Sequence, residues 1–204
     1  MKKIFIIILT LIAAFAAIPP IVIMNSKRTP DISSTSYTSP AETEALHIST
    51  KDEIIYAVSD AMQYIDTDTP YDVRRAVLDI CRNNLNFYTD NQTELPQVSI
   101  TNYSDELYEK LVKEYEKQRF SFSYNNKNVY IPISKSGNLK TATTDEYAYL
   151  ESVASPWEAY REDFKKTEEP KCGVSVYGLI FLEEKIGIKD SLCYYLPGFE
   201  VNEK

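Results

Sequence analysis

The chain has 204 residues, of which 44% are hydrophobic and 25% are charged, enough for one domain with a buried core plus additional sequence. Its formal net charge of −8 argues against nucleic acid as a partner, because a DNA-binding surface needs basic residues to displace counterions. Three cysteines without a CxxC pair and a single histidine, His47, argue against a metal site or a histidine base, and no cofactor is expected.

An uncharged apolar segment opens the chain. After two lysines, residues 4–24 carry no charge over 21 positions, which is long enough for a helix that crosses a bilayer. A cleavable signal peptide is the alternative, because Ala14 and Ala16 form an Ala-x-Ala site. Since the apolar run continues past that site, we expect residues 1–24 to form a single-pass membrane anchor, with the C-terminal domain extracytoplasmic.

A polar stretch separates this segment from the rest of the chain. Residues 25–47 read NSKRTPDISSTSYTSPAETEALH and are expected to form a disordered Ser/Thr/Pro stalk. The folded domain is therefore expected over residues 48–204. All 30 acidic residues lie after Arg28, so this part of the chain is strongly negative, which argues against an anionic lipid or polymer as its main ligand.

Three amphipathic helices are predicted in the first half of the domain. The first lies in STKDEIIYAVSDAMQYI, where Thr50 and Glu53 have the spacing of a capping box. The second has Thr69 as its cap and Pro70 at its first position, a place that proline favours. The third begins at Ser104 and continues through DELYEKLVKEYEKQ.

Strand-like sequence follows the third helix. RFSFSY and NVYIPI, separated by NNK, alternate between apolar and polar residues and predict a β-hairpin. EYAYLESVASPWEAY then leads into a Ser-Pro-Trp turn, and two short helices are predicted to finish the chain. The expected fold class is α+β: a single small mixed domain with N- and C-terminal helices around an antiparallel hairpin-based sheet, preceded by a transmembrane helix.

Four segments carry a resemblance to a known family. The closest match is YLESVASPWE, against a family-like YLKSVDSPWD, and PYDVRRAVLDICRNNL, YNNKNVYIPISKSGNL and PKCGVSVYGLIFLEEKIGIKDSLCYYLPGFEV match in patches. In this order they resemble the stage II sporulation protein D (SpoIID) family and the related LytB amidase-enhancer proteins. Members of that family are typically anchored by one N-terminal helix and act on cell-wall glycan outside the membrane.

The resemblance implies a glycan-binding site. The positions matched to it are Asp72, Arg75, Arg82, Ser136, Gly137, Ser155, Trp157, Ser175 and Tyr177. Hydrogen-bond donors and ring faces among them suit sugar hydroxyls and the apolar faces of sugar rings. Peptidoglycan glycan strands are the partner that the resemblance implies, with a cell-wall amidase or another anchored wall-remodelling protein as a further candidate.

The chain departs from the family at the acid that cleaves the glycan. The family's AAEMP motif carries a glutamate, whose place is taken by Ala61 when the motif is aligned on Met62, or by Tyr64 when it is aligned by length. Neither can donate a proton near neutral pH, because a methyl group has none and a phenol titrates near ~10. Asp60 and Asp66 are the carboxyl groups close enough in sequence to act as substitutes.

Other catalytic parts of the family are also lost. Ile133 and Pro170 stand where the family has histidines, and the loop that binds zinc in some members is missing. We therefore expect a non-catalytic SpoIID-like protein at the cell wall, linked to sporulation or the septum, that binds peptidoglycan or a hydrolase partner. The alternatives are an active lytic transglycosylase with a relocated carboxylate and an unrelated anchored interaction module. Pairing of Cys172 with Cys193 stays open.

Overall fold

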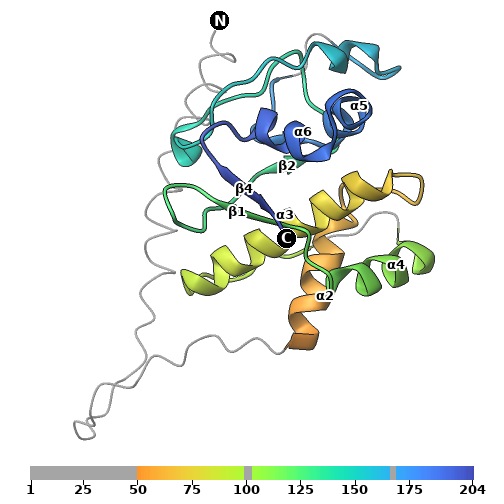
Figure 1. Ribbon diagram of the computed structural model, residues 1–204, viewed down its shortest axis with the longest axis vertical. Coiled ribbons are helices and arrows are strands. Elements are labelled where there is room, and N and C mark those ends of the chain that lie inside the picture. Colours follow the sequence, from red (N-terminus) through yellow and green to blue (C-terminus); the bar gives the residue numbers. More distant parts are fainter. Residues whose placement is uncertain (1–49, 99–102, 166–168) are drawn as a thin grey trace, which may run out of the picture. The chain divides into compact units, whose positions relative to one another are not determined.

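In the computed structural model, residues 50–98, 103–165 and 169–204 are described (Figure 1). Over these residues the elements follow in the order α2 (Thr50–Ala61), α3 (Tyr71–Asp90), α4 (Asp105–Tyr115), β1 (Phe120–Ser123), β2 (Ile133–Ser134), η1 (Asp145–Tyr147), η2 (Pro156–Tyr160), β3 (Val174–Ser175), α5 (Val176–Ile186), α6 (Ile188–Tyr195) and β4 (Glu200–Glu203). The described part of the chain is a small α+β domain with five α-helices and short strands.

Helix α3 forms the centre of this domain. It packs against the other four α-helices and against β1, and Figure 1 places α5 and α6 on one side of it and α2 and α4 on the other. Its residues from Val73 to Cys81 are all buried, including Arg74, Arg75 and Asp79. Burial all round is typical of a helix that is surrounded by protein.

The helices begin close to where their sequence signals place them. At α3 the prediction is off by one residue: Pro70 occupies the N-cap position, and Thr69, predicted as the cap, instead accepts from the backbone N–H of Asp66 at 2.9 Å. Ser104 caps α4 as predicted, its Oγ accepting a hydrogen bond from the backbone N–H of Leu107 at 3.3 Å. Ser175 caps α5 in the same way, accepting from the backbone N–H of Gly178 at 3.2 Å. The two predicted C-terminal helices are confirmed as α5 and α6.

The predicted hairpin is wrong, although its turn forms. Tyr124 and Lys127 exchange backbone hydrogen bonds of 3.0 Å around Asn125 and Asn126, which both have positive φ, as this kind of turn requires. Beyond the turn, however, the two arms separate. Strand β1 pairs in antiparallel register with β4, from Phe120 opposite Glu203, and β2 pairs in parallel with β3.

Side chains of α3 explain why the second arm does not pair with the first. Asn84 binds Ile131 twice: its Nδ2 donates to the carbonyl at 2.8 Å, and its Oδ1 accepts from the backbone N–H at 2.7 Å. Asn83 donates to the carbonyl of Val129 at 2.8 Å. Pro132 has no backbone N–H to donate to a neighbouring strand. The backbone groups of Val129 and Ile131 are thus satisfied by side chains of a helix instead of by β1.

We expect Asn84→Ala to lower the free energy of unfolding by about 1–3 kcal/mol, because it leaves two buried backbone groups of Ile131 without partners. Chemical denaturation of the variant and of the native chain measures this difference. Asn83→Ala is the matched control and should cost less, since it removes one bond, to the half-buried Val129. Equal costs would mean that Asn84 does not hold this segment.

The expected fold class also needs correction in its membrane-spanning helix. None of the helices in residues 50–98, 103–165 and 169–204 combines the length and the apolar character that crossing a bilayer requires. The corrected class for this part of the chain is a small α+β domain with two short two-stranded pairings and no membrane-spanning helix. The segment at 4–24 for which that helix was predicted lies outside the described residues, as does the stalk at 25–47.

The three cysteines form no disulfide. Cys81, Cys172 and Cys193 are free thiols, so Cys172 and Cys193 are not paired in this structure.

Candidate functional site

Side chains from three separate segments line a groove of about 230 Å³, which we call the aromatic groove. They come from the end of α3, from residues 129–130 and from residues 146–149 at η1. The lining residues are Phe87, Tyr88, Val129, Tyr130, Glu146, Tyr147 and Tyr149. Five aromatic rings and one carboxylate therefore meet at one place on the surface.

The rings of the aromatic groove contact one another in a continuous row. Tyr88 meets Tyr130 edge to face with centroids 5.6 Å apart, and Tyr130 stacks on Tyr147 at 5.8 Å. Tyr147 meets Tyr149 edge to face at 6.2 Å, and the row continues beyond the groove to Tyr124, 5.8 Å from Tyr149. All five tyrosines are half-buried, so each presents part of its ring to solvent.

Hydrogen bonds to the backbone hold the ring-bearing segments in place. Asn84 fixes the segment that carries Tyr130, and the hydroxyl of Tyr149 donates to the carbonyl of Tyr130 at 2.6 Å. Thr144 caps η1, its Oγ1 accepting from the backbone N–H of Tyr147 at 3.3 Å. The groove is therefore built on anchored backbone, which keeps its ring faces in one arrangement without a ligand.

Negative charge lies close to the groove tyrosines. Burial, then a hydrogen bond to Glu146 and its charge, raises the pKa of Tyr147 to about 12. Burial also raises the pKa of Tyr130, and neighbouring acidic groups, Asp60 among them, raise it further. These phenols stay protonated at neutral pH and can donate hydrogen bonds. Glu146 is the one charged residue among the described residues that line the groove.

Of the two positions aligned with the family's glutamate, Ala61 is the last residue of α2 and Tyr64 lies in the turn after it. Ala61 is fully buried in the hydrophobic core, so a side chain there does not reach solvent. Tyr64 is half-buried, and burial followed by the charge of Asp60 raises its pKa well above the ordinary value. Tyr64 is one of the charges that raise the pKa of Tyr130, but neither Tyr64 nor Ala61 lines the aromatic groove. Neither aligned position holds a carboxyl group.

The two possible substitutes differ in environment. Asp60 is half-buried, accepts a hydrogen bond from Gln63 Nε2 at 2.8 Å and faces the thiol of Cys81. Burial raises the pKa of Asp60 above its usual value. Asp66 is exposed and lies 3.9 Å from the ammonium group of Lys135. Only Asp60 has the partly desolvated surroundings that an acid catalyst requires.

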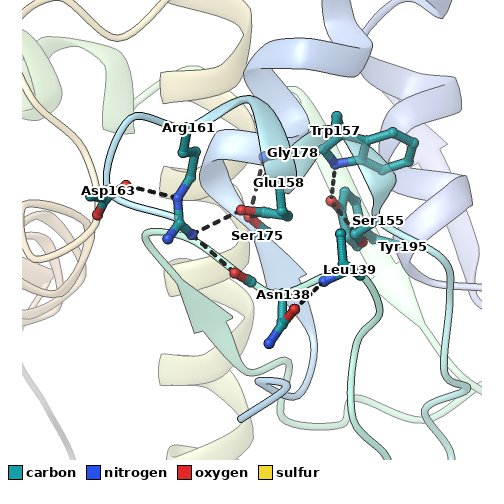
Figure 2. Close-up of polar contacts among 11 residues, drawn as sticks. Asn138, Leu139, Ser155, Trp157, Glu158, Arg161, Asp163, Ser175, Gly178 and Tyr195 are labelled. Atoms are coloured by element: carbon teal, nitrogen blue, oxygen red, sulfur yellow. Dashed lines mark hydrogen bonds and ion pairs between the residues drawn. The ribbon is translucent and has the colours of Figure 1, made fainter. Parts of the chain in front are cut away.

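A buried polar network lies beneath the Ser-Pro-Trp turn (Figure 2). Glu158 is fully buried; its Oε2 accepts from Arg161 Nη1 at 3.0 Å and its Oε1 accepts from Ser175 Oγ at 2.5 Å. Arg161 also donates to the carbonyl of Gly137 at 3.0 Å. A Cβ at Gly137 would lie 3.2 Å from Glu158 Oε1, so little space is left there. The network joins the loop before η1, η2 and the start of α5.

Trp157 and its neighbours form a packed corner beside this network. The indole Nε1 donates to the hydroxyl of Tyr195 at 3.0 Å, and Ser155 Oγ lies 3.5 Å from the same hydroxyl (Figure 2). The indole also stacks on Phe181 with centroids 5.8 Å apart. Gly178 makes room for this arrangement, since a Cβ there would lie 1.7 Å from the hydroxyl of Tyr195. Trp157 and Ser155 thus serve the packing of the C-terminal helices.

The predicted binding residues on α3 face its neighbours instead of the aromatic groove. Asp72 forms an ion pair with Arg119. Arg75 is buried and donates to a backbone carbonyl of α4 at 2.6 Å, and Arg82 lies 3.8 Å from the centre of a tyrosine ring of α4. These side chains therefore hold α3 to α4 and to the start of β1.

The remaining predicted residues gather near the start of α5. Ser136 lines an open hollow of about 540 Å³ together with Arg161 and Lys171. Tyr177 is half-buried, and its backbone N–H donates to the carbonyl of Lys135 at 3.0 Å. The structure thus brings together Ser136, Gly137, Ser155, Trp157 and Ser175 around one corner, and it leaves the predicted residues of α3 apart from them.

The sequence-based prediction misses the residues of the aromatic groove. Two signals were available: the sixteen tyrosines of the chain, and the pair Tyr147 and Tyr149 two positions apart. No local pattern joins this pair to Tyr88 or Tyr130, because the rings come from segments far apart in the sequence. No protein-family model and no curated protein matches the sequence.

Proposed function

We propose that this chain is a SpoIID-like protein that acts outside the cytoplasm, where it binds peptidoglycan glycan strands in the aromatic groove without cleaving them. The observation that carries the proposal is the groove itself, a continuous row of half-buried tyrosines that line one hollow of the surface. Aromatic rings offer flat apolar faces for the C–H faces of sugar rings, and phenol groups add polar contacts at their edges.

The lack of cleavage follows from the residues at the two positions that align with the family's glutamate, Ala61 and Tyr64. Hydrolysis or lytic cleavage of a glycosidic bond needs a proton delivered to the leaving oxygen, generally by a carboxylic acid. Ala61 is buried and has no proton to give, and the raised pKa of Tyr64 keeps its phenol protonated at neutral pH. A site that has the tyrosine rings but lacks a carboxylic acid at the aligned positions favours glycan binding over glycan cleavage.

We expect Tyr130→Ala to weaken binding of the full-length protein to purified peptidoglycan sacculi roughly 5- to 30-fold, as for a central aromatic residue of an interface. Tyr130 is chosen because its ring contacts both Tyr88 and Tyr147. Co-sedimentation with sacculi gives the bound fraction, and chromatography of the supernatant detects any released muropeptide or glycan fragment.

The matched control for this experiment is Tyr160→Ala. Tyr160 is a tyrosine outside the aromatic groove that is 74% exposed, so its loss should leave binding unchanged. Failure of the native protein to sediment with sacculi would refute the proposal. Equal losses from Tyr130→Ala and Tyr160→Ala would show that binding does not take place in the groove.

One observation favours a second candidate function, a glycan-cleaving enzyme with a relocated acid. Asp60 is half-buried, has a raised pKa and lies close enough to Tyr64 and Tyr130 to raise theirs. A carboxyl group that stays protonated closer to neutral pH can act as a general acid. Product release by the native protein that disappears in Asp60→Asn, with sacculus binding retained, would select this function over the first.

A further inference from the structure

The charge of the aromatic groove complements one class of ligand. Its lining consists of five aromatic residues, Val129 and Glu146, and none of these described residues carries a positive charge. The faces of aromatic rings are electron-rich and attract cations, most strongly where water is partly excluded. Aromatic rings beside a carboxylate form a site for an organic cation. An anion would be repelled by Glu146, and no positively charged lining residue would offset that repulsion.

Glu146 supplies the negative charge at this groove. It lines the groove, and it contributes, after burial, to raising the pKa of Tyr88, Tyr147 and Tyr149. An ammonium ion placed among these rings would be attracted by the ring faces and by the carboxylate of Glu146 together.

We infer that the aromatic groove selects glycan that bears free amino groups, binding the ammonium group of a de-N-acetylated amino sugar between its tyrosine rings and Glu146. This inference rests on the proposed function, since it names the form of glycan that the groove prefers. A glucosamine unit offers both features that the groove matches, a C–H face for the rings and a cation for the carboxylate. The N-acetylated unit offers the face alone.

The test compares two oligosaccharides that differ only at the amino groups, tetraglucosamine and its fully N-acetylated form. In isothermal titration calorimetry with the full-length protein, we expect tetraglucosamine to bind roughly 5- to 30-fold more tightly, the range that one desolvated cation–π contact and one ion pair supply. Glu146→Gln should reduce this preference about three- to five-fold and leave the affinity for the acetylated form unchanged.

The matched control is Glu151→Gln, because Glu151 is an exposed carboxylate close in sequence that does not line the aromatic groove. The control separates a defined site from the general attraction of a polycation to a chain with net charge −8. Equal losses of preference from Glu146→Gln and Glu151→Gln would overturn the inference. A second pair, Tyr147→Phe and Tyr147→Leu, separates the ring from the hydroxyl, and the inference requires the preference to survive only in Tyr147→Phe.

A third arm separates failure of the inference from failure of the proposed function. Sacculi are compared before and after acetylation of their free amines with acetic anhydride. Binding that is equal for both preparations, with equal affinities for the two oligosaccharides, overturns the inference and leaves the proposed function intact. Loss of binding after acetylation supports the inference. Absence of binding to both preparations and to both oligosaccharides overturns the proposed function and the inference with it.

Discussion

Replacement of Glu158 with alanine should lower the free energy of unfolding by about 3–5 kcal/mol, the cost of breaking a buried ion pair from one side. The carboxylate has no solvent exposure and binds Arg161 and Ser175. Its removal leaves the guanidinium group of Arg161, whose side chain is 4% exposed, without its buried counterion. Urea denaturation monitored by circular dichroism measures the change.

Asp163→Ala is the matched control for this variant. Asp163 also pairs with Arg161, at 3.0 Å between Oδ1 and Nε, but its side chain is 80% exposed. An exposed carboxylate is worth about 0–1 kcal/mol in such a pair, so the control should change stability little. A double variant, Glu158→Leu with Arg161→Met, should recover much of the loss, since an apolar pair leaves no buried charge. Similar costs for Glu158→Ala and Asp163→Ala would contradict the importance of burial here.

Trp157→Ala should destabilise the domain by about 3–5 kcal/mol, the usual cost of removing a large buried aromatic residue. The residue is 8% exposed, stacks on Phe181 and donates to the hydroxyl of Tyr195. As the single tryptophan of the chain, it also reports its own environment, and the native protein should show blue-shifted, poorly quenched emission. Thermal and chemical unfolding of the variant give the free-energy difference.

Tyr160→Ala controls for the ring contact alone. Tyr160 also stacks on Phe181, with ring centroids 6.0 Å apart and the same near-parallel orientation as Trp157. Unlike Trp157, however, Tyr160 is 74% exposed. We expect its removal to cost within about 0.5 kcal/mol, because surface substitutions rarely exceed that. Freely quenched, red-shifted emission from native Trp157, or equal costs for the two variants, would mean that this corner is not packed as described.

The local signals of the sequence were sufficient for the helices and insufficient for the sheet. Pro70 and Ser104 act within one turn of their own positions, so they mark the starts of α3 and α4 without any knowledge of the rest of the fold. The two arms around Asn125 and Asn126 carry a hairpin pattern, but pairing depends on which backbone groups remain available. Asn84, more than forty residues earlier, takes those of Ile131, and this could not be predicted from the arms themselves.

The candidate site could be predicted only in part for the same reason. The resemblance to SpoIID pointed to Trp157 and Ser175, and the structure uses both in the buried corner at the start of α5. The aromatic groove depends on rings brought together by tertiary structure, and Tyr88 and Tyr130 stand in no motif. The motif residues Trp157 and Ser175 are buried, whereas the tyrosines of the groove are half-buried. A motif can point to residues that resemble those of a family, but exposure decides which residues a ligand can reach.

The pairing of β1 with β4 has a consequence for how the chain is made. Residues far from β1 in the sequence complete its pairing: Glu203 lies opposite Phe120, and the backbone N–H of Lys204 donates to the carbonyl of Arg119 at 2.8 Å. During synthesis, β1 leaves the ribosome long before its partner, and its edge stays open until β4 has been made. Folding of this domain is therefore completed only after β4 has left the ribosome. A ribosome that stalls before β4 would leave an unpaired strand edge, a substrate for chaperones or proteases.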